Sequence, residues 1–427
     1  MNSLYILSFV IFSMIYAWVI YHIIILVAGI WHIKRSRGGC EGEFSFNVGE
    51  LPTISIIIPA KDEEKVIGRC LDAFLKLDYP KEKIEIIVVE DGSRDRTAQI
   101  CSEYARRYRG LIKFFHKPTS NGKPSALNFG LKHAKGELIG VFDADSVPES
   151  DILKRVAKYF NDLRVIALQG RNLSINADEN MLTKLISYED AVRYEAYIRG
   201  KETLRLFVPL TGSCYFIRRN VLLDVGGWDD NCLSEDAELA AKLLEKGIKI
   251  KYASDVKCWQ ENPSNLRNMY KQRKRWFRGT MEVALKYGVL LRRPRKMNID
   301  AELTLAGPFM FIPCFLGYLL GVYSLIFSHS LGGLLGILAQ LFTLTSVITL
   351  FIIGATLSYT IKHMRKINLL WIFLIYAYWL AQIIVALHAF GEMLLRRPKK
   401  WERTEKTGAS TLTLSYNSDL QCHKFKI

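Results

Sequence analysis

The sequence predicts an α/β domain with a mostly parallel sheet flanked by helices, bounded by transmembrane α-helices at both ends of the chain. From about residue 51 to residue 255, short runs of β-branched residues alternate with segments of helical spacing. Near-continuous apolar strands separated by helices are typical of a parallel sheet covered on both faces. Hydrophobic residues make up 50% of the chain, and the longest apolar stretches lie towards its two ends.

The expected elements follow one another in chain order. We expect strands over 54–58, 84–89, 112–115 and 138–142, and helices over 65–75, 97–108, 124–134, 237–246 and 265–286. Pro59 should end the first strand, because proline cannot donate a ladder hydrogen bond. The turn after that strand, residues 59–64, lacks the glycine cradle of a dinucleotide fold, and no Walker phosphate loop is found. Hydride transfer is therefore not expected.

The terminal apolar stretches predict membrane spans. Residues 4–33 are too long for the core of a signal peptide and are followed by Lys34, Arg35 and Arg37. Positive charges after a span favour a cytoplasmic position for the next domain. Three further apolar stretches cover about 303–327, 331–359 and 369–395. The expected organisation is a transmembrane helix over 1–33, a cytoplasmic domain over 34–262, amphipathic interfacial helices over 263–300, about three transmembrane helices over 301–396 and a basic or polar tail over 397–427. We expect a multi-pass protein of the cell membrane.

The number of spans stays open. Three simple spans after a cytoplasmic domain would leave the tail outside, yet residues 396–406 are strongly basic. Either one stretch is re-entrant or divided, or the tail departs from the positive-inside tendency. Pro308 and Pro313 favour an irregular first stretch. The polar chain after about Lys406 is expected to be disordered.

The formal charge of +16 could indicate a nucleic-acid partner. Much of the positive excess flanks the apolar stretches, however, and no nucleic-acid-binding module is recognised, so none is expected as a partner. The eight cysteines form no Cys-x-x-Cys pair, which favours reduced thiols over a disulfide scaffold.

Two groups of acidic residues follow predicted strands. Glu90-Asp91-Gly92-Ser93 comes after the second strand, and Asp143-Ala144-Asp145 follows the strand over 138–142. Ligands collect at the carboxyl ends of strands in open α/β sheets. Carboxylates placed there suit a hard divalent cation that holds a diphosphate. The alternative is a pair of solvated turns, because aspartate is common in turns.

Two further groups lie on predicted helices. Ser234-Glu235-Asp236 precedes the helix over 237–246, where a serine cap and acids at the positive helix end would be an equally simple explanation. Gln272-Arg273-Lys274-Arg275-Trp276 belongs to the basic helix over 265–286, which could simply lie on a membrane surface. In the functional interpretation, Arg275 holds a diphosphate by paired hydrogen bonds and Trp276 stacks on an acceptor.

These four groups, in this order and spacing, resemble the processive membrane-bound family 2 glycosyltransferases, which include cellulose, chitin, hyaluronan and poly-N-acetylglucosamine synthases. The resemblance covers about residues 51–280. It implies a GT-A-like fold, a nucleotide-sugar donor that we expect to be UDP-linked, and Mg²⁺ or Mn²⁺ as cofactor. Serine at position 234 and proline at position 124 depart from the threonine and alanine usual in the family.

The resemblance also implies roles for individual residues. On the donor side, Asp91 matches the acid that contacts uracil, Lys123 matches a nucleotide-contacting lysine, and Gln272 and Arg275 match the residues that close over the diphosphate. Asp145 matches the metal ligand, and Asp143 matches an acid near the nucleotide and the metal. Asp236 matches the general base, with Glu235 beside it, while Trp276 matches the acceptor entrance and Thr211-Gly212-Ser213 a turn near the acceptor.

The implied reaction is an inverting, metal-dependent transfer of a sugar to a growing β-linked polysaccharide at the lipid bilayer. One alternative keeps the donor chemistry and adds a single sugar to a lipid acceptor. A remoter alternative is a non-enzymatic basic membrane scaffold, which gives no reason for the ordered acids. The sugar, the linkage and the oligomeric state stay open.

Overall fold

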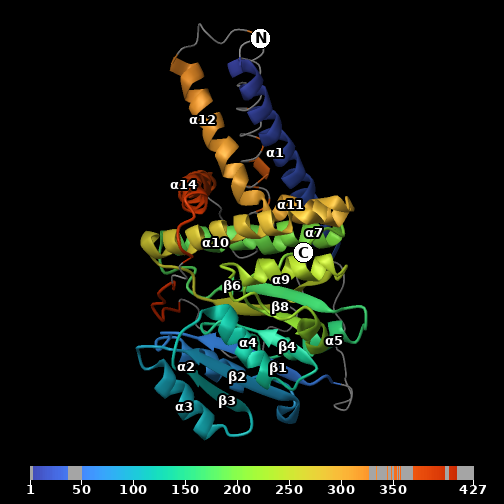
Figure 1. Cartoon of the computed structure of the whole chain (residues 1–427), viewed down its shortest axis with the longest axis vertical. Coiled ribbons are helices and arrows are strands. Elements are labelled where there is room, and N and C mark those ends of the chain that lie inside the picture. The colour runs from blue at the N-terminus through green and yellow to red at the C-terminus, as the bar shows by residue number, and fades with distance from the viewer. Residues whose placement is uncertain are drawn as a thin grey trace, which may run out of the picture.

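The computed structural model describes residues 3–36, 51–326, 369–399 and 403–410, with a few single positions between 333 and 356. In Figure 1 the α/β domain occupies one end of the molecule, and a layer containing α10, α7 and α11 lies above it. The helices α1 and α12 rise from this layer and contact each other. The fold is therefore an α/β domain joined through a helical layer to long apolar helices.

The domain is built on one eight-stranded sheet. Its strands are β1 (Ile54–Ala60), β2 (Ile84–Asp91), β3 (Ile112–Lys117), β4 (Leu138–Val141), β5 (Val147–Pro148), β6 (Ala167–Ser174), β7 (Tyr215–Arg218) and β8 (Ile250–Gln260). Their spatial order is β3-β2-β1-β4-β7-β6-β8-β5. The β3-β2-β1-β4 half is parallel, as predicted.

The sheet is mixed but mostly parallel, because β6 also pairs parallel with β8 and only β5 and β7 run in the reverse direction. β7 runs antiparallel to both β4 and β6, and β5 runs antiparallel to β8. Val141 at the end of β4 pairs with Tyr215 at the start of β7. This reversed direction brings the turn that precedes β7 beside the acids that follow β4.

β1 corrects the prediction that Pro59 ends the first strand. The strand continues to Ala60, and Pro59 pairs with Val89 of β2. On its other side, β1 pairs with β4 only over Ile54–Ile57. Proline is tolerated here because that edge is open at position 59, where no partner strand requires its missing N–H.

The five helices predicted between residues 65 and 286 are each present to within a few residues, and further helices that were not predicted lie between residues 152 and 224. The helices are α1 (Ser3–Ser36), α2 (Ile67–Leu75), α3 (Thr97–Arg107), α4 (Lys123–His133), α5 (Ile152–Phe160), α6 (Met181–Ala191), a π-helix (Val192–Ile198), α7 (Arg199–Thr203), α8 (Arg219–Asp224), α9 (Glu235–Glu245), α10 (Leu266–Tyr287), α11 (Lys296–Leu305), α12 (Phe311–Ile326) and α14 (Leu369–Leu394).

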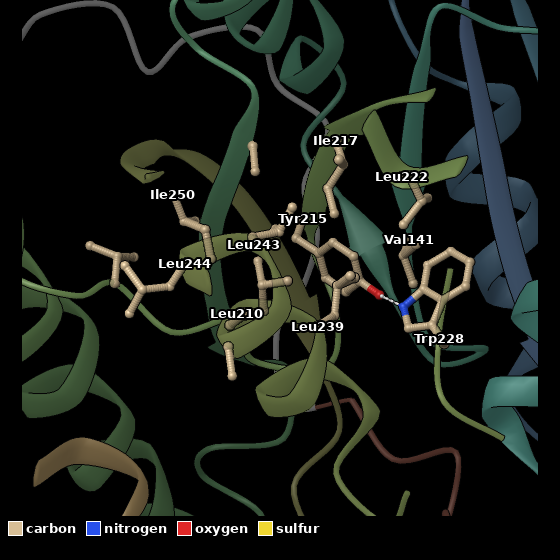
Figure 2. Packing of buried hydrophobic residues seen from close by; sticks show 14 of the residues in the cluster. Val141, Leu210, Tyr215, Ile217, Leu222, Trp228, Leu239, Leu243, Leu244 and Ile250 are labelled. Atoms are coloured by element: carbon tan, nitrogen blue, oxygen red, sulfur yellow. Dashed lines mark hydrogen bonds between the residues drawn. The ribbon is translucent and has the colours of Figure 1, made fainter. Parts of the chain in front are cut away.

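Both faces of the sheet are buried, as the β-branched strands predict. In β1, Ile57 belongs to one core cluster, while Ile56 and Ile58 belong to the other. Figure 2 shows part of the first cluster, in which side chains of β4, β7 and α9 meet. Trp228 Nε1 donates a hydrogen bond of 2.9 Å to the hydroxyl oxygen of Tyr215 there. The buried indole N–H thus has a hydrogen-bond partner, and the two side chains pack in the same cluster as Leu239 of α9.

Two described helices are long and apolar enough to cross a membrane, over Ile6–Arg35 and Phe373–Leu394. A third span is possible only if two helices over Lys296–Leu305 and Gly307–Leu320 count as one, and these meet at a bend of 59°. This break, directly before Pro308, confirms the irregularity expected in the first late stretch. The stretch over 331–359 lies almost entirely outside the described residues. In Figure 1, α14 is seen nearly end-on, whereas α1 and α12 follow the long axis.

A buried polar cluster joins α1 to the α/β domain. Lys201 of α7 is fully buried, and its Nζ donates to Asp300 Oδ2 at 2.8 Å and to Thr304 Oγ1 at 2.7 Å. Tyr21 of α1 donates its hydroxyl to Asp300 Oδ1 at 2.6 Å. We call these residues the Lys201 cluster. It connects α1, α7 and α11 through one ion pair.

Candidate active site

The acids that follow β4 occupy two different environments. The side chain of Asp143 is 36% exposed, whereas that of Asp145 is 2% exposed. The Ser146 N–H donates to the Asp143 carbonyl at 3.0 Å, which closes a tight turn between them. The strand end therefore presents Asp143 towards solvent and holds Asp145 inside the protein.

Lys123, the first residue of α4, connects most of the predicted site. Its Nζ lies 2.7 Å from Asp143 Oδ1 and 3.1 Å from Glu235 Oε1, and it donates to the Gly212 carbonyl at 2.8 Å. Burial alone would lower the pKa of Lys123, but the charges of Asp143 and Glu235 raise it well above its usual value. One charged ammonium group thus joins the end of β4, the start of α9 and the turn before β7.

Asp236 lies in the first turn of α9, beside this ammonium group. A Cβ atom added at Gly212, whose φ is +78°, would lie 3.5 Å from Asp236 Oδ2 and 3.7 Å from Lys123 Nζ. Burial raises the pKa of the Asp236 carboxyl, and the neighbouring charge of Glu235 raises it further, to about 6. Glycine at 212 therefore leaves room for a group to approach Asp236.

The start of α9 differs from the capping interpretation. Ser234 occupies the N-cap position, but its side chain makes no capping hydrogen bond. Its hydroxyl instead faces α10, where a Cβ atom at Gly279 would lie 2.2 Å from Ser234 Oγ. The three acids of the first turn, Glu235, Asp236 and Glu238, still complement the positive helix end.

The helix α10 brings Arg275 to the same carboxylates. Burial lowers the pKa of Arg275, while the charges of Glu235, Asp236 and Asp143 act to raise it. Gln272, Arg275 and Trp276 are spaced three and four residues apart, so they share one helix face. The guanidinium carbon of Arg273 lies 4.6 Å from the Trp276 ring centroid, which fixes the position of the indole.

Asp91 lies to one side of this network. Its carboxylate accepts hydrogen bonds from Lys117 Nζ at 2.8 Å, from Ser120 Oγ at 2.7 Å and from the Gly122 N–H at 3.0 Å. These bonds shape the loop that leads directly into Lys123. A neighbouring hollow of about 510 Å³ is lined by Lys61, Asp62, Gly92, Ser93, Arg94, His116, Pro118 and Ser120. Its volume falls in the range of small-molecule sites.

Thr211 supports the turn before β7. Its N–H donates to Gln169 Oε1 at 2.9 Å, and its Oγ1 accepts from the Tyr194 hydroxyl at 2.9 Å. Tyr194 belongs to the π-helix, an irregularity frequently found at functional sites. The turn predicted to lie near the acceptor is thus held between β6 and that helix.

Asp143 and Asp145 offer hard oxygen ligands for a divalent cation. No group of three or more His, Cys, Asp or Glu side chains that could hold a metal ion is found within the described part of the chain. Mg²⁺ is commonly held by one or two carboxylates together with substrate phosphates. The donor set therefore fits a cation whose coordination is completed by a diphosphate.

Several site residues were missed in the sequence. Gln260 Nε2 donates to Asp143 Oδ2 at 3.2 Å, and the Glu261 N–H donates to Asp145 Oδ2 at 3.0 Å. Lys406 Nζ donates to the same oxygen of Asp145 at 2.5 Å. The position of Gln260 at the end of β8 could have revealed it by the strand-end rule. Lys406 could not be found in this way, because the tail was expected to be disordered. That expectation, made for the chain after about Lys406, is wrong for residues 407–410, and residues 411–427 lie outside the described part.

A GT-A-like sheet with acids beyond β2 and β4, a third acidic group at a helix start and a cationic helix above them defines a glycosyltransferase that uses nucleotide-sugar donors. Residues 52–279, more than half of the chain, match the family described as "Glycosyltransferase like family 2". The chain belongs to this family.

Curated relatives share the family but differ in acceptor. The chain is 31% identical over 424 residues to the probable glycosyltransferase YdaM of Bacillus subtilis (strain 168), covering 94% of this chain and 97% of that protein. It is 32% identical over 256 residues to the beta-monoglucosyldiacylglycerol synthase of Nostoc sp., covering 58% of this chain and 53% of the synthase. It is 31% identical over 241 residues to the poly-beta-1,6-N-acetyl-D-glucosamine synthase of Staphylococcus aureus (strain COL), covering 56% and 57%. The chain thus spans about half the length of the last two.

A solved structure supports the fold over most of the chain. The mannosyltransferase PcManGT from Pyrobaculum calidifontis, solved with GDP-Man and Mn²⁺, superposes with a TM-score of 0.61 at 20% identity. The match covers 91% of this chain and all of that one. The GT-A-like fold predicted from the motifs is confirmed.

Proposed function

We propose that the chain transfers a sugar from a UDP-linked donor to an acceptor at the cell membrane, by a metal-dependent displacement that inverts the anomeric centre. The observation that carries the proposal is the contact of Lys123 with Asp143, Glu235 and Gly212. It brings the expected donor and acceptor sides of the reaction within the reach of one side chain.

Asp236 is proposed as the general base. With a pKa of about 6 its carboxyl is largely ionised at neutral pH, yet it is basic enough to accept the proton of an acceptor hydroxyl. The acceptor oxygen forms its bond to the anomeric carbon as the bond to the diphosphate oxygen breaks. Glu235 is held by Lys123, so Asp236 is the carboxylate assigned to this step. A single displacement of this kind turns an α-linked donor into a β-linkage.

The departing diphosphate requires positive charge. Arg275 is half-buried near the site carboxylates and is proposed to hold the diphosphate, with Gln272 on the same helix face. Asp145 and Asp143 would hold Mg²⁺ or Mn²⁺, which neutralises developing negative charge when bound. The Mn²⁺ in PcManGT supports a divalent cation of this kind. Asp91 and the adjacent hollow are proposed to receive the uracil and ribose.

We assign a growing β-linked polysaccharide as the preferred acceptor, with Trp276 and the turn over Thr211 and Gly212 at its entrance. The Staphylococcus relative favours this acceptor, whereas the Nostoc relative favours the second candidate, a single transfer to a lipid. Lys34 and Arg35 in the last turn of α1 support a cytoplasmic α/β domain in a multi-pass protein.

Product analysis separates these candidates. The full chain is purified in detergent and supplied with labelled UDP-sugars, Mg²⁺ and Mn²⁺. A ladder or polymer supports the polysaccharide acceptor, and one lipid-extractable product supports the lipid acceptor. Absence of both transfer and hydrolysis with every nucleotide sugar would contradict the proposal.

Substitution of the base tests the mechanism. Asp236→Asn should retain donor binding, measured by calorimetry, and lose sugar transfer. Asp162→Asn is the matched control, because Asp162 pairs with Arg164 on the loop before β6, at the opposite end of the strands. Full activity of Asp236→Asn would exclude the assigned role.

A further inference from the structure

The segment over residues 403–410, which follows α14, lies on the candidate donor site. Lys406 Nζ donates to Asp145 Oδ2 at 2.5 Å and to the Glu261 carbonyl at 2.7 Å. Lys406 and Asp145 are separated by 261 residues. The end of the described chain thus reaches the acid proposed to bind the metal.

Several contacts fix this segment in place. The Glu261 carboxylate accepts from the Thr407 N–H at 2.5 Å, from Thr407 Oγ1 at 3.0 Å and from the Gly408 N–H at 3.1 Å. Arg69 donates to the Gly408 carbonyl at 3.2 Å. Gly408 has a φ of +82°, and an added Cβ atom would lie 3.1 Å from the Lys65 carbonyl oxygen. These contacts involve backbone and side-chain atoms of both the segment and the α/β domain, so the segment is held at a defined position on that domain.

Charge explains why Asp145 holds a lysine. The Asp145 side chain is 2% exposed, and a buried carboxylate requires a counter-charge and hydrogen bonds. In this structure Lys406 supplies the charge, and the Glu261 N–H supplies a second hydrogen bond to the same oxygen. A divalent cation on that oxygen would stand within a few ångströms of the ammonium group, where like charges repel strongly. Lys406 and a cation therefore cannot both occupy Asp145 Oδ2.

We propose that Lys406 is a built-in counter-ion of Asp145, and that binding of the divalent cation displaces it. The C-terminal segment is then an internal competitor of the cation at the donor site. This inference rests on the proposed function, because it takes Asp145 as the metal ligand. The buried site stays neutralised before the donor arrives, and the segment is released when cation and nucleotide bind.

The first test measures Mn²⁺ binding to the full chain by electron paramagnetic resonance of the free ion, without any sugar donor. Lys406→Met keeps the length of the side chain and removes its charge, so it should bind Mn²⁺ at least about fivefold more tightly than the wild type. Lys406→Arg keeps the charge and should bind Mn²⁺ like the wild type. Equal affinities of Lys406→Met and the wild type would overturn the proposal.

A matched control separates this contact from a general change of charge. Lys399 lies in the same C-terminal region but pairs with Glu282 at 3.0 Å, away from Asp145. Lys399→Met removes one positive charge and should leave the Mn²⁺ affinity within experimental error. A gain equal to that of Lys406→Met would also overturn the proposal.

The second test follows release of the segment by trypsin. Cleavage after Arg403 and Lys406, identified by mass spectrometry, should be slow in the free protein and faster with Mn²⁺ and UDP. Asp145→Asn should accelerate the same cleavage without Mn²⁺. Unchanged protection under saturating Mn²⁺ and UDP would refute displacement. Neither readout requires sugar transfer, so a loss of transfer alone would count against the proposed function and not against this inference.

Discussion

At the scale of single residues, the ammonium group of Lys123 lies between two carboxylates that approach from different elements, Asp143 after β4 and Glu235 in α9. Its side chain is only 15% exposed, so neither carboxylate can exchange this partner for bulk water without rearrangement. The same group donates a hydrogen bond of 2.8 Å to the Gly212 carbonyl. The geometry around Asp236 therefore depends on the charge of Lys123, which also lowers the pKa of Asp236.

Removal of that charge should destabilise the fold as well as the site. Lys123→Met leaves Asp143 and Glu235 without their shared cation, and we expect a loss of about 3 kcal/mol in the free energy of unfolding. Lys113→Met is the control, because Lys113 pairs with Glu85 in β2 and is 34% exposed; a loss below about 1 kcal/mol is expected there. Denaturant unfolding in detergent measures both. Equal losses would contradict the structural role of Lys123.

The pH profile should report Asp236. Its pKa is raised to about 6, and only the ionised carboxylate accepts a proton, so kcat/KM should fall as the pH decreases through about 6. Glu235 raises that pKa by its negative charge, whereas Lys123 and Arg193 lower it. Glu235→Gln should therefore move the acidic limb to lower pH. A limb that does not move, or a profile that is flat down to pH 5, would contradict the assignment.

The local pattern is sufficient to place Asp143 at a strand end and Glu235 and Asp236 at a helix start, whereas Lys123 was singled out only by the resemblance to the family. The local pattern is insufficient for Glu261, which contacts Asp145 through a backbone N–H that every residue except proline possesses. It is equally insufficient for Lys406, whose partner is 261 residues away. Such contacts have no local periodicity from which they could be predicted.

At the scale of elements, α10 is the helix that lies between the candidate site and the apolar helix α14. It contacts α9 on one side and α14 on the other, and it carries Arg275 and Trp276. Gly279, one turn further along, allows α10 to approach Ser234 at the start of α9. The distance between the cationic face of α10 and the carboxylates of α9 is thus set by a glycine.

A methyl group at that position should separate the two helices. In Gly279→Ala the new Cβ atom would lie 2.9 Å from both the backbone nitrogen and the Cβ atom of Ser234, so rotation of the serine hydroxyl cannot relieve the clash and α10 must shift and carry Arg275 with it. A displacement of about 1 Å at a catalytic group can lower kcat by about 100-fold, and we expect a loss of that order. Gly288→Ala is the control, since an added Cβ atom meets nothing within 4 Å there. Normal kcat in Gly279→Ala would show that the approach is not required.

At the scale of the whole molecule, the sequence correctly predicted the α/β domain, its mostly parallel sheet and the apolar ends, but not the reversed direction of β5 and β7. β7 is a short apolar run whose direction depends on the connection through α6, the π-helix and α7, and residue type does not encode direction. The bend after α11 was predicted from Pro308, because proline has a local effect. Positions of long apolar helices relative to one another depend on contacts between distant segments.

The Lys201 cluster should stabilise the packing of α1 against α7 and α11. Lys201→Met would leave Asp300 buried without its cation, and loss of a buried partner costs about 3–5 kcal/mol. Lys251→Met provides a control, because Lys251 pairs with Glu202 and is 42% exposed, and its loss should stay below about 1 kcal/mol. Thermal unfolding in detergent compares the two. A shift in melting temperature no larger than that of the control would argue against this role.

The same cluster has a consequence for biosynthesis. Tyr21 is translated 279 residues before Asp300, so α1 is synthesised long before its final partner. Until then the ammonium group of Lys201 lacks its carboxylate, and the nascent α/β domain cannot complete its packing against α1. Expression fragments that stop before residue 300 would retain this unmatched charge, whereas fragments extended through α11 would include both halves of the ion pair.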